Sequence, residues 1–101
     1  MVRKRNGRLE PFDPDKIRRG LESALVDRPV PAGTIDRLVD RCEAHAREVA
    51  TEISADEIGR LVLEGLREAD HVAYLRFASV YKDFQGAGDF EREMAALEDR
   101  G

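Results

Sequence analysis

The chain has 101 residues, of which 42% are hydrophobic and 38% are charged, and its formal net charge is -4. This length fits one domain with a modest core, and the composition is too apolar for a disordered chain and too charged for a membrane protein. No apolar run approaches the ~20 residues that cross a bilayer, and no apolar stretch follows the basic N-terminus as in a signal peptide, so we expect a cytoplasmic protein.

The cysteine and histidine content predicts neither a disulfide nor a metal site. Cys42 is the only cysteine, and its position among apolar residues at helical spacing is typical of a small core residue. His45 and His71 are lone residues in helical patterns, and we interpret both as surface residues. Because no nucleophile–base pair and no phosphate-binding Gly-Lys-Ser/Thr loop occurs either, we expect that the protein is not an enzyme.

Positive charge is concentrated near the N-terminus. Residues 1–8 contain four cationic side chains and no acidic one, and three more cations follow between positions 16 and 19. A local basic patch on an acidic domain favours a small anion as partner over a nucleic-acid face. A solvated charged edge explains the composition equally well, so composition alone leaves both interpretations open.

The first predicted elements are a β-hairpin and a helix. Residues 2–5 and 9–12 flank Asn6-Gly7, which is the strongest two-residue hairpin signal because both positions tolerate positive φ. Asp13 and Pro14 then suit the cap and the first position of a helix. The apolar residues of this helix fall at helical spacing, and the segment 27–29 ends it at a proline.

A third strand and further helices are predicted downstream. The second helix starts near residue 33 or 34, and a short strand over residues 50–53 is expected to lie beside the hairpin. Ser54 and Glu57 match the capping box that opens a third helix, and Asp70 can cap the fourth. The fourth helix is apolar over a wide arc, which is typical of a central helix. Residues 86–88 are expected to end it before a short last helix.

These elements predict an α+β fold that is mostly α. A small three-stranded cap, made of the hairpin and the third strand, lies on a bundle of about four helices with a short C-terminal helix appended. The junction between the basic hairpin and the first helix is a candidate anion site, because the N-terminus of a helix carries partial positive charge.

Three segments resemble the ATP-cone, a regulatory domain of ribonucleotide reductases. The first is the basic opening, Val2-Arg3-Lys4-Arg5-Asn6-Gly7, followed by Glu10-Pro11-Phe12-Asp13 and Lys16-Ile17. The others are Arg28-Pro29-Val30 and the stretch Val72-Ala73-Tyr74-Leu75-Arg76-Phe77-Ala78-Ser79-Val80-Tyr81. Both resemble the nucleotide-sensing half of the NrdR repressors of ribonucleotide reductase operons. The resemblance implies an ATP-cone nucleotide-binding domain over residues 1–90 and a helical tail over residues 91–101.

The resemblance also implies a nucleotide site. Lys4 and Arg5 match the strand cations that hold the nucleotide phosphates, and Lys16 matches the helix lysine that faces the nucleotide. Such cations suit a triphosphate because Arg and Lys form charge-assisted hydrogen bonds with it. Val2 matches the strand position against the base, and Glu10 matches the acidic position that helps to orient the ligand.

Two further candidates, Tyr81 and Lys82, match the fourth-helix segment that closes the pocket in the repressors, although a tyrosine there is equally consistent with a core residue. The family implies ATP or dATP as ligand, with Mg²⁺ able to accompany the phosphates. It also implies nucleotide-dependent formation of homo-oligomers, which controls the expression or activity of ribonucleotide reductase. Two alternatives stay open: a nucleic-acid-binding module that uses the basic strand, and a non-catalytic interaction domain whose nucleotide site has decayed.

The sequence departs from the repressors in two respects. NrdR proteins carry a four-cysteine zinc ribbon that reads the operator DNA, whereas this sequence contains one cysteine. We therefore expect no zinc and no specific DNA binding from this chain, which is either a part of a longer repressor or a free-standing cone. Pro31 stands where the repressors usually have a serine able to cap the second helix, so we expect a ragged start there.

Overall fold

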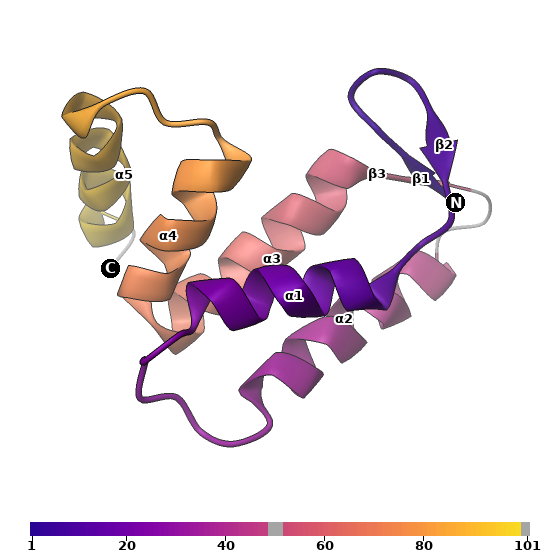
Figure 1. The fold of residues 1–101 in the computed structure, drawn as a ribbon, viewed down its shortest axis with the longest axis horizontal. Helices are drawn as coiled ribbons and strands as arrows, with labels where there is room; N and C mark the ends of the chain where they lie inside the picture. Colours follow the sequence, from indigo (N-terminus) through magenta and orange to yellow (C-terminus); the bar gives the residue numbers. More distant parts are fainter. Residues whose placement is uncertain (49–51, 100–101) are drawn as a thin grey trace.

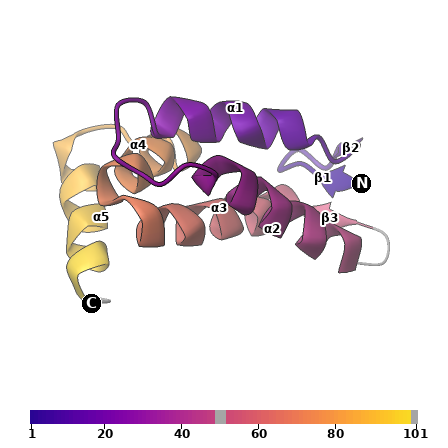
Figure 2. The same cartoon turned by 90° about the horizontal axis from the view of Figure 1, so that it is seen from below.

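The computed structural model describes residues 1–48 and 52–99, and within these ranges it has three short strands and five helices. The strands are β1 (Val2–Arg3), β2 (Leu9–Glu10) and β3 (Ile53–Ser54). The helices are α1 (Pro14–Ala24), α2 (Thr34–Glu48), α3 (Ala55–Ala69), α4 (His71–Tyr81) and α5 (Ala87–Asp99). The sheet lies at one end of the helical bundle and α5 at the other (Figures 1 and 2). This arrangement confirms the predicted α+β, mostly α fold.

The three strands form one mixed sheet in the order β2-β1-β3. β1 pairs antiparallel with β2, which places Val2 opposite Glu10, and parallel with β3, which places Val2 opposite Ile53. Val2 and Ile53 are buried, so the middle of the sheet covers one end of the core. β3 runs from Ile53 to Ser54, so among the described residues of the predicted 50–53 strand Ile53 belongs to it and Glu52 does not. Residues 50 and 51 of that prediction lie outside the described residues.

The hairpin turn is wider than the two-residue turn predicted at Asn6-Gly7. The Lys4 N–H donates to the Arg8 carbonyl at 2.8 Å, and the Gly7 N–H donates to the Lys4 carbonyl at 2.9 Å. Gly7 has a φ of +87°, but Asn6 does not have the positive φ that the predicted turn requires. The Asn6 side chain instead accepts from the Arg8 N–H at 3.0 Å, which stabilises the wider turn.

Side-chain caps begin α1 and α3 as predicted. Asp13 accepts from the Asp15 N–H at 3.0 Å, and Ser54 accepts from the Glu57 N–H at 3.1 Å. The carboxylate of Glu57 lies 3.3 Å from Nε2 of His45, so it joins α2 to α3 rather than completing the predicted capping box. α2 begins at Thr34, within the predicted boundary, and its acidic first-turn residue is Asp36.

The hydrophobic core lies between α1, α2, α3 and α4. Its largest fully buried side chains are Leu21, Val39, Cys42, Val62 and Leu66. Removing these side chains from water is the main force that holds the four helices together. Cys42 is the small core residue that the sequence predicts, and burial raises the pKa of its thiol. Among the described residues, no helix is long and apolar enough to cross a membrane.

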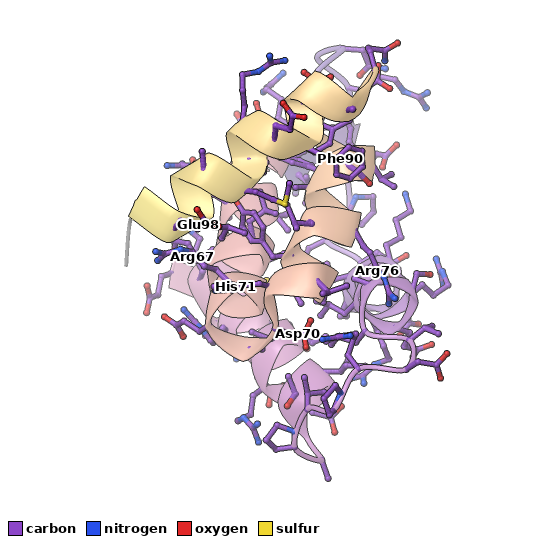
Figure 3. All side chains as sticks on the ribbon, turned by 90° about the vertical axis from the view of Figure 1, so that its left-hand side faces the viewer. Arg67, Asp70, His71, Arg76, Phe90 and Glu98 are labelled. Carbon is purple, nitrogen blue, oxygen red and sulfur yellow. The ribbon has the colours of Figure 1, made fainter. Side chains whose placement is uncertain are left out.

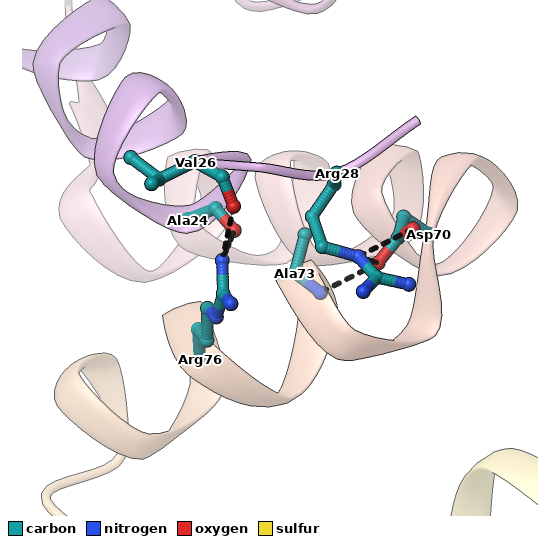
Figure 4. A network of polar contacts seen from close by, with 6 residues as sticks. All are labelled: Ala24, Val26, Arg28, Asp70, Ala73 and Arg76. Atoms are coloured by element: carbon teal, nitrogen blue, oxygen red, sulfur yellow. Dashed lines mark hydrogen bonds and ion pairs between the residues drawn. The ribbon is translucent and has the colours of Figure 1, made fainter. Parts of the chain in front are cut away.

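Asp70 joins three segments of the chain at the α3–α4 junction (Figure 4). Its N–H donates to the Leu66 carbonyl at 2.8 Å, and its carboxylate accepts from the Ala73 N–H at 2.9 Å, so it ends α3 and caps α4. Nε of Arg28 lies 2.9 and 3.0 Å from the two carboxylate oxygens, which fixes the α1–α2 connection to the same point. Burial works to raise the pKa of Asp70, but the Ala73 amide and the Arg28 guanidinium outweigh it and hold that pKa below its ordinary value.

Arg76 fixes α4 to the end of α1. Its guanidinium donates to the carbonyl oxygens of Ala24 at 3.1 Å and Val26 at 2.7 Å (Figure 4). The last carbonyls of a helix have no hydrogen-bond partner within the helix and carry partial negative charge. A guanidinium at this position supplies the missing donors and the opposite charge. Figure 3 shows Arg76 on the side of α4 that faces α1, away from α5.

α5 packs mainly on α4. The Tyr74 hydroxyl donates to the Glu93 carboxylate at 2.7 Å, and Nζ of Lys82 lies 3.0 and 3.1 Å from the same carboxylate. Phe84 and Phe90 add an edge-to-face pair with ring centroids 4.9 Å apart. One carboxylate, one aromatic pair and the burial of Leu97 in the hydrophobic core therefore hold α5 in place.

α4 ends earlier than predicted. Its last helical residue is Tyr81, and Asp83 then adopts the left-handed conformation with a φ of +54°, which stops the helix. The Asp89 carboxylate accepts from the Gln85 N–H at 2.7 Å at the start of α5. Residues 87 and 88 therefore begin α5, whereas the sequence predicted that they end α4.

Candidate functional site

A pocket of about 250 Å³ lies where the sheet meets the starts of α1 and α3 and the end of α4. Apolar side chains line its interior, namely Val2, Phe12, Ile17, Ile58, Val62 and Phe77. Lys4, Glu10 and Lys16 lie on its rim, and Tyr81 lines the α4 side. An apolar interior with a few charged groups at the rim suits a ligand that combines a flat apolar group with an anionic group.

Glu10 joins the two lysines of the rim. Its Oε2 lies 3.5 Å from Nζ of Lys4 and 3.4 Å from Nζ of Lys16, so one carboxylate on β2 connects the residue that follows β1 with α1. Desolvation works to raise the pKa of Glu10, but the two ammonium groups outweigh it and hold that pKa below its ordinary value. Glu10 is therefore ionised at neutral pH and offsets part of the lysine charge.

Arg5 forms the other side of the rim with Tyr81 and Asp56. Nε of Arg5 lies 3.1 Å from Oδ1 of Asp56, and its Cζ lies 5.0 Å from the centroid of the Tyr81 ring, which is a cation–π contact. The Tyr81 hydroxyl donates to the same Asp56 oxygen at 3.0 Å. These hydrogen bonds, first from Tyr81 and then from Arg5, hold the pKa of Asp56 below its ordinary value. Burial, and then the hydrogen bond to Asp56, raises the pKa of Tyr81.

Gly59 leaves the space that the Tyr81 ring occupies. A Cβ atom at Gly59 would lie only 2.4 Å from Cε1 and Cζ of Tyr81, so α3 needs a glycine at this position. The Phe77 ring stacks on the Tyr81 ring, with the two ring centroids 6.0 Å apart. The sequence analysis missed Gly59, although an isolated glycine within a helical pattern is a signal of close approach by another group.

The structure brings six of the seven predicted ligand residues to one place. Five line the pocket itself: Val2, Lys4, Glu10, Lys16 and Tyr81. Arg5 lies in an adjoining hollow that Lys4, Glu10 and Tyr81 also line. Lys82 lies elsewhere, because its ammonium group contacts Glu93 on α5. Successive residues of a helix point about 100° apart, so Tyr81 and its neighbour Lys82 do not face one site.

The sequence analysis did not predict the part that α3 contributes. Ala55 at the start of α3 lines both the pocket and the adjoining hollow, and Asp56 is the ion-pair partner of Arg5. Ser54 caps α3, and its hydroxyl oxygen accepts from the Glu57 N–H in the first turn of the helix. The start of α3 therefore brings a helix N-terminus, with its partial positive charge, to the rim of the pocket.

The sequence profile of the ATP cone domain matches residues 1–87 of the chain. The chain belongs to the ATP-cone family. The matched segment of this ATP-cone contains strands β1 to β3, helices α1 to α4 and every described residue that lines the pocket, and it ends at the first residue of α5.

Curated relatives of this ATP-cone are transcriptional repressors named NrdR. The repressor of Thermomicrobium roseum is 49% identical over 98 residues, which are 96% of this chain and 61% of the repressor. That of Methylobacterium sp. (strain 4-46) is 47% identical over 99% of this chain and 54% of the repressor. That of Corynebacterium diphtheriae is 46% identical over 99% of this chain and 67% of the repressor. The ATP-cone thus spans between about half and two thirds of the length of these relatives.

Proposed function

We propose that this ATP-cone binds ATP or dATP in the pocket and reports the nucleotide level to the control of ribonucleotide reductase, in the manner of the NrdR repressors that it resembles. The observation that carries this proposal is an apolar pocket whose rim holds Lys4, Arg5 and Lys16. The adenine base suits the apolar interior, and the triphosphate suits the rim because lysine and arginine form charge-assisted hydrogen bonds with phosphate.

Phosphate must replace two carboxylates as the partner of the rim cations. In the structure Glu10 contacts both lysines and Asp56 contacts Arg5, so each cation already has a partner. A triphosphate carries more negative charge than either carboxylate and can also accept from backbone N–H groups at the start of α3. Because the rim is partly exposed, we expect the affinity for nucleotide to fall as the salt concentration rises.

The proposed response to nucleotide is a change in self-association. ATP and dATP differ only at the ribose 2′ position, so a different response to each requires contacts that differ there or a different number of bound molecules. A nucleotide that binds one assembly more tightly shifts the population toward that assembly. This role requires binding alone, so we propose a regulatory domain without nucleotide hydrolysis, in which Mg²⁺ enters with the phosphates.

Calorimetric titration with ATP and with dATP tests the proposal. The variants are Lys4→Ala/Arg5→Ala, which removes two rim cations, and Arg8→Ala, which removes an exposed cation of the same hairpin that does not line the pocket. We expect the natural chain and Arg8→Ala to bind, and the double variant to lose at least about tenfold in affinity, because it lacks two charge-assisted contacts.

Three results would count against this function. No heat of binding with either nucleotide would leave the domain as an interaction module without a working site. Equal losses in Arg8→Ala and in the double variant would show that the overall positive charge of the hairpin, rather than the pocket, attracts the anion. Binding of DNA that nucleotide does not alter would favour the nucleic-acid alternative.

A further inference from the structure

A second hollow, of about 340 Å³, lies between the start of α2 and the end of α3 and is called the α2–α3 hollow below. These two helix ends are on the side of the bundle away from the sheet (Figures 1 and 2). Among the described residues, none lines both this hollow and the pocket described above. Two arginines of α2, Arg37 and Arg41, line the hollow, and its volume is within the range of small-molecule sites.

Small residues of α3 leave this hollow open. Gly65 and Ala69 line it from α3, and Leu38 lines it from α2. A Cβ atom at Gly65 would overlap Cδ2 of Leu38, so α2 packs directly on the α3 backbone here. The same Cβ atom would lie 3.7 Å from Nη1 of Arg41. The Arg41 guanidinium therefore lies over the α3 backbone, at the edge of an apolar floor.

Neutral oxygen atoms hold the Arg37 guanidinium at the start of α2. Its Nη2 donates to Oγ1 of Thr34 at 3.2 Å, and its Nη1 donates to the Ala32 carbonyl at 3.5 Å. The Thr34 hydroxyl donates in turn to the Pro31 carbonyl at 2.7 Å, which fixes the threonine side chain. These contacts position the guanidinium without neutralising its charge.

The two guanidinium groups have little negative charge beside them. Within the described part of the chain, Arg37 has no carboxylate within ion-pair distance, and the one carboxylate contact of Arg41 is Glu68 at 3.9 Å, too long for a hydrogen bond. By comparison, Arg28 lies 2.9 Å from Asp70. The Glu68 side chain is 74% exposed, so solvent screens its attraction for Arg41. Each arginine has five N–H donors, so both have donors left for a ligand.

The start of α2 adds partial positive charge on the same side. Thr34, the first residue of α2, lines the hollow, and the N-terminus of a helix favours an anion. The acidic residue of this first turn, Asp36, is directed toward α1, because Nη1 of Arg18 lies 2.6 Å from its Oδ1. The hollow therefore has an excess of positive charge from two side chains and one helix end.

We propose that the α2–α3 hollow is a second anion site of this ATP-cone, which takes a phosphate group as the free ion or as a small monoester. Residues four apart on a helix have Cβ atoms about 5–6 Å apart, so Arg37 and Arg41 can both donate to one phosphate. Phosphate has more acceptor oxygens than a carboxylate and about twice its charge at neutral pH, which favours it at a pair of guanidinium groups. This site does not rest on the nucleotide function proposed above.

Nuclear magnetic resonance of the full, ¹⁵N-labelled chain tests the site, because it reports binding residue by residue. The probes are inorganic phosphate, glycerol phosphate and acetate, each titrated at constant ionic strength. We expect saturable shifts of the Thr34 and Gly65 amides and of the Nε–H groups of Arg37 and Arg41 with a phosphate probe. Acetate should bind at least about threefold more weakly. The stronger of the two phosphate probes identifies the free ion or the ester as the ligand.

Three variants test which charges hold the phosphate. Arg37→Gln/Arg41→Gln should lose at least about fivefold in affinity. Arg19→Gln/Arg47→Gln is the matched control, because it removes the same charge from two exposed arginines that do not line the hollow, and it should stay within about twofold of the natural chain. Glu68→Gln removes the carboxylate that competes for Arg41, so it should raise the affinity by about two- to threefold.

Three outcomes would overturn this site. They are the absence of saturable shifts at the hollow with both phosphate probes, equal losses in the double variant and its matched control, and acetate binding as tightly as phosphate. The rim of the other pocket also attracts phosphate, so the titration is repeated with Lys4→Ala/Arg5→Ala. Shifts at the hollow should persist there with an affinity within about twofold. Their loss would contradict an independent site, whereas their persistence in a chain that binds no nucleotide would leave it standing.

Discussion

Replacement of Gly59 by alanine tests whether the Tyr81 ring lies against α3 as the structure places it. The added methyl carbon would lie 2.4 Å from Cε1 and Cζ of Tyr81 and 2.6 Å from its hydroxyl oxygen. Ordinary contact begins near 3.4 Å, so the ring must move by about 1 Å (3.4 minus 2.4). That movement draws the hydroxyl away from Asp56 and the ring away from Arg5, so we expect nucleotide affinity to fall as well.

Two opposing contributions determine the effect on stability. Alanine is more favourable than glycine in a helix interior by roughly 0.5–1 kcal/mol, whereas overpacking costs about 1–3 kcal/mol. Gly59→Ala should therefore lower the free energy of unfolding by about 1 kcal/mol. In a Tyr81→Ala background the ring is gone, and the same substitution should raise the free energy of unfolding by roughly 0.5–1 kcal/mol. The double-mutant cycle should give a coupling between the two positions of about 1–3 kcal/mol.

Urea unfolding of the four chains, followed by far-ultraviolet circular dichroism, measures this cycle. Gly20→Ala is the control, because a Cβ atom there would lie 3.4 Å from Cε2 of Phe77, which is ordinary contact. We expect Gly20→Ala to stabilise the chain by roughly 0.5–1 kcal/mol in both Tyr81 backgrounds. An equal stabilisation by Gly59→Ala in both backgrounds would refute the placement of the Tyr81 ring against α3.

Three further predictions concern the rim, the α3–α4 junction and α5. Asp56→Asn removes the negative charge that competes with the ligand for Arg5. Calorimetry should therefore show the affinity for ATP raised by about two- to fivefold, which is the effect of one exposed ion pair. A lower affinity would instead mean that Asp56 helps to bind the ligand. The depressed pKa of Asp70 means that its stabilising contribution is present above the ordinary carboxyl pKa of about 3.9 and is lost as the pH falls through its lower folded-state pKa. The urea midpoint should therefore change less between pH 7 and about pH 3 in Asp70→Asn than in the natural chain, and identical changes would contradict the Asp70 contacts. The ammonium group of Lys82 contacts Glu93 on α5. Lys82→Ala should therefore leave the affinity for ATP unchanged but lower the hydrogen-exchange protection of α5. A loss of affinity equal to that of Lys4→Ala would instead place Lys82 in the nucleotide site.

Sequence patterns predicted those features of the fold that depend on neighbouring residues. The caps at Asp13, Ser54 and Asp70 are confirmed, because each side chain accepts from an amide only two or three residues further along the chain. The hairpin was predicted in the right place but with the wrong turn. The Asn6 side chain accepts from the Arg8 N–H, and this contact stabilises the wider turn in place of the predicted two-residue turn. The end of α4 was placed too late, because the left-handed conformation of Asp83 has no clear signal in the sequence.

The sequence by itself determined the α+β class, the family and the residue types that make a nucleotide site plausible, because these follow from local periodicity and from a pattern of cations and acids near the N-terminus. Only the tertiary structure decided which residues share that site. Packing of α3 against α4 brings Asp56 and Gly59 to Tyr81 and directs Lys82 to α5. Contacts between residues so distant in sequence depend on how whole helices pack, and that arrangement is determined by burial of the core as a whole rather than by any local motif.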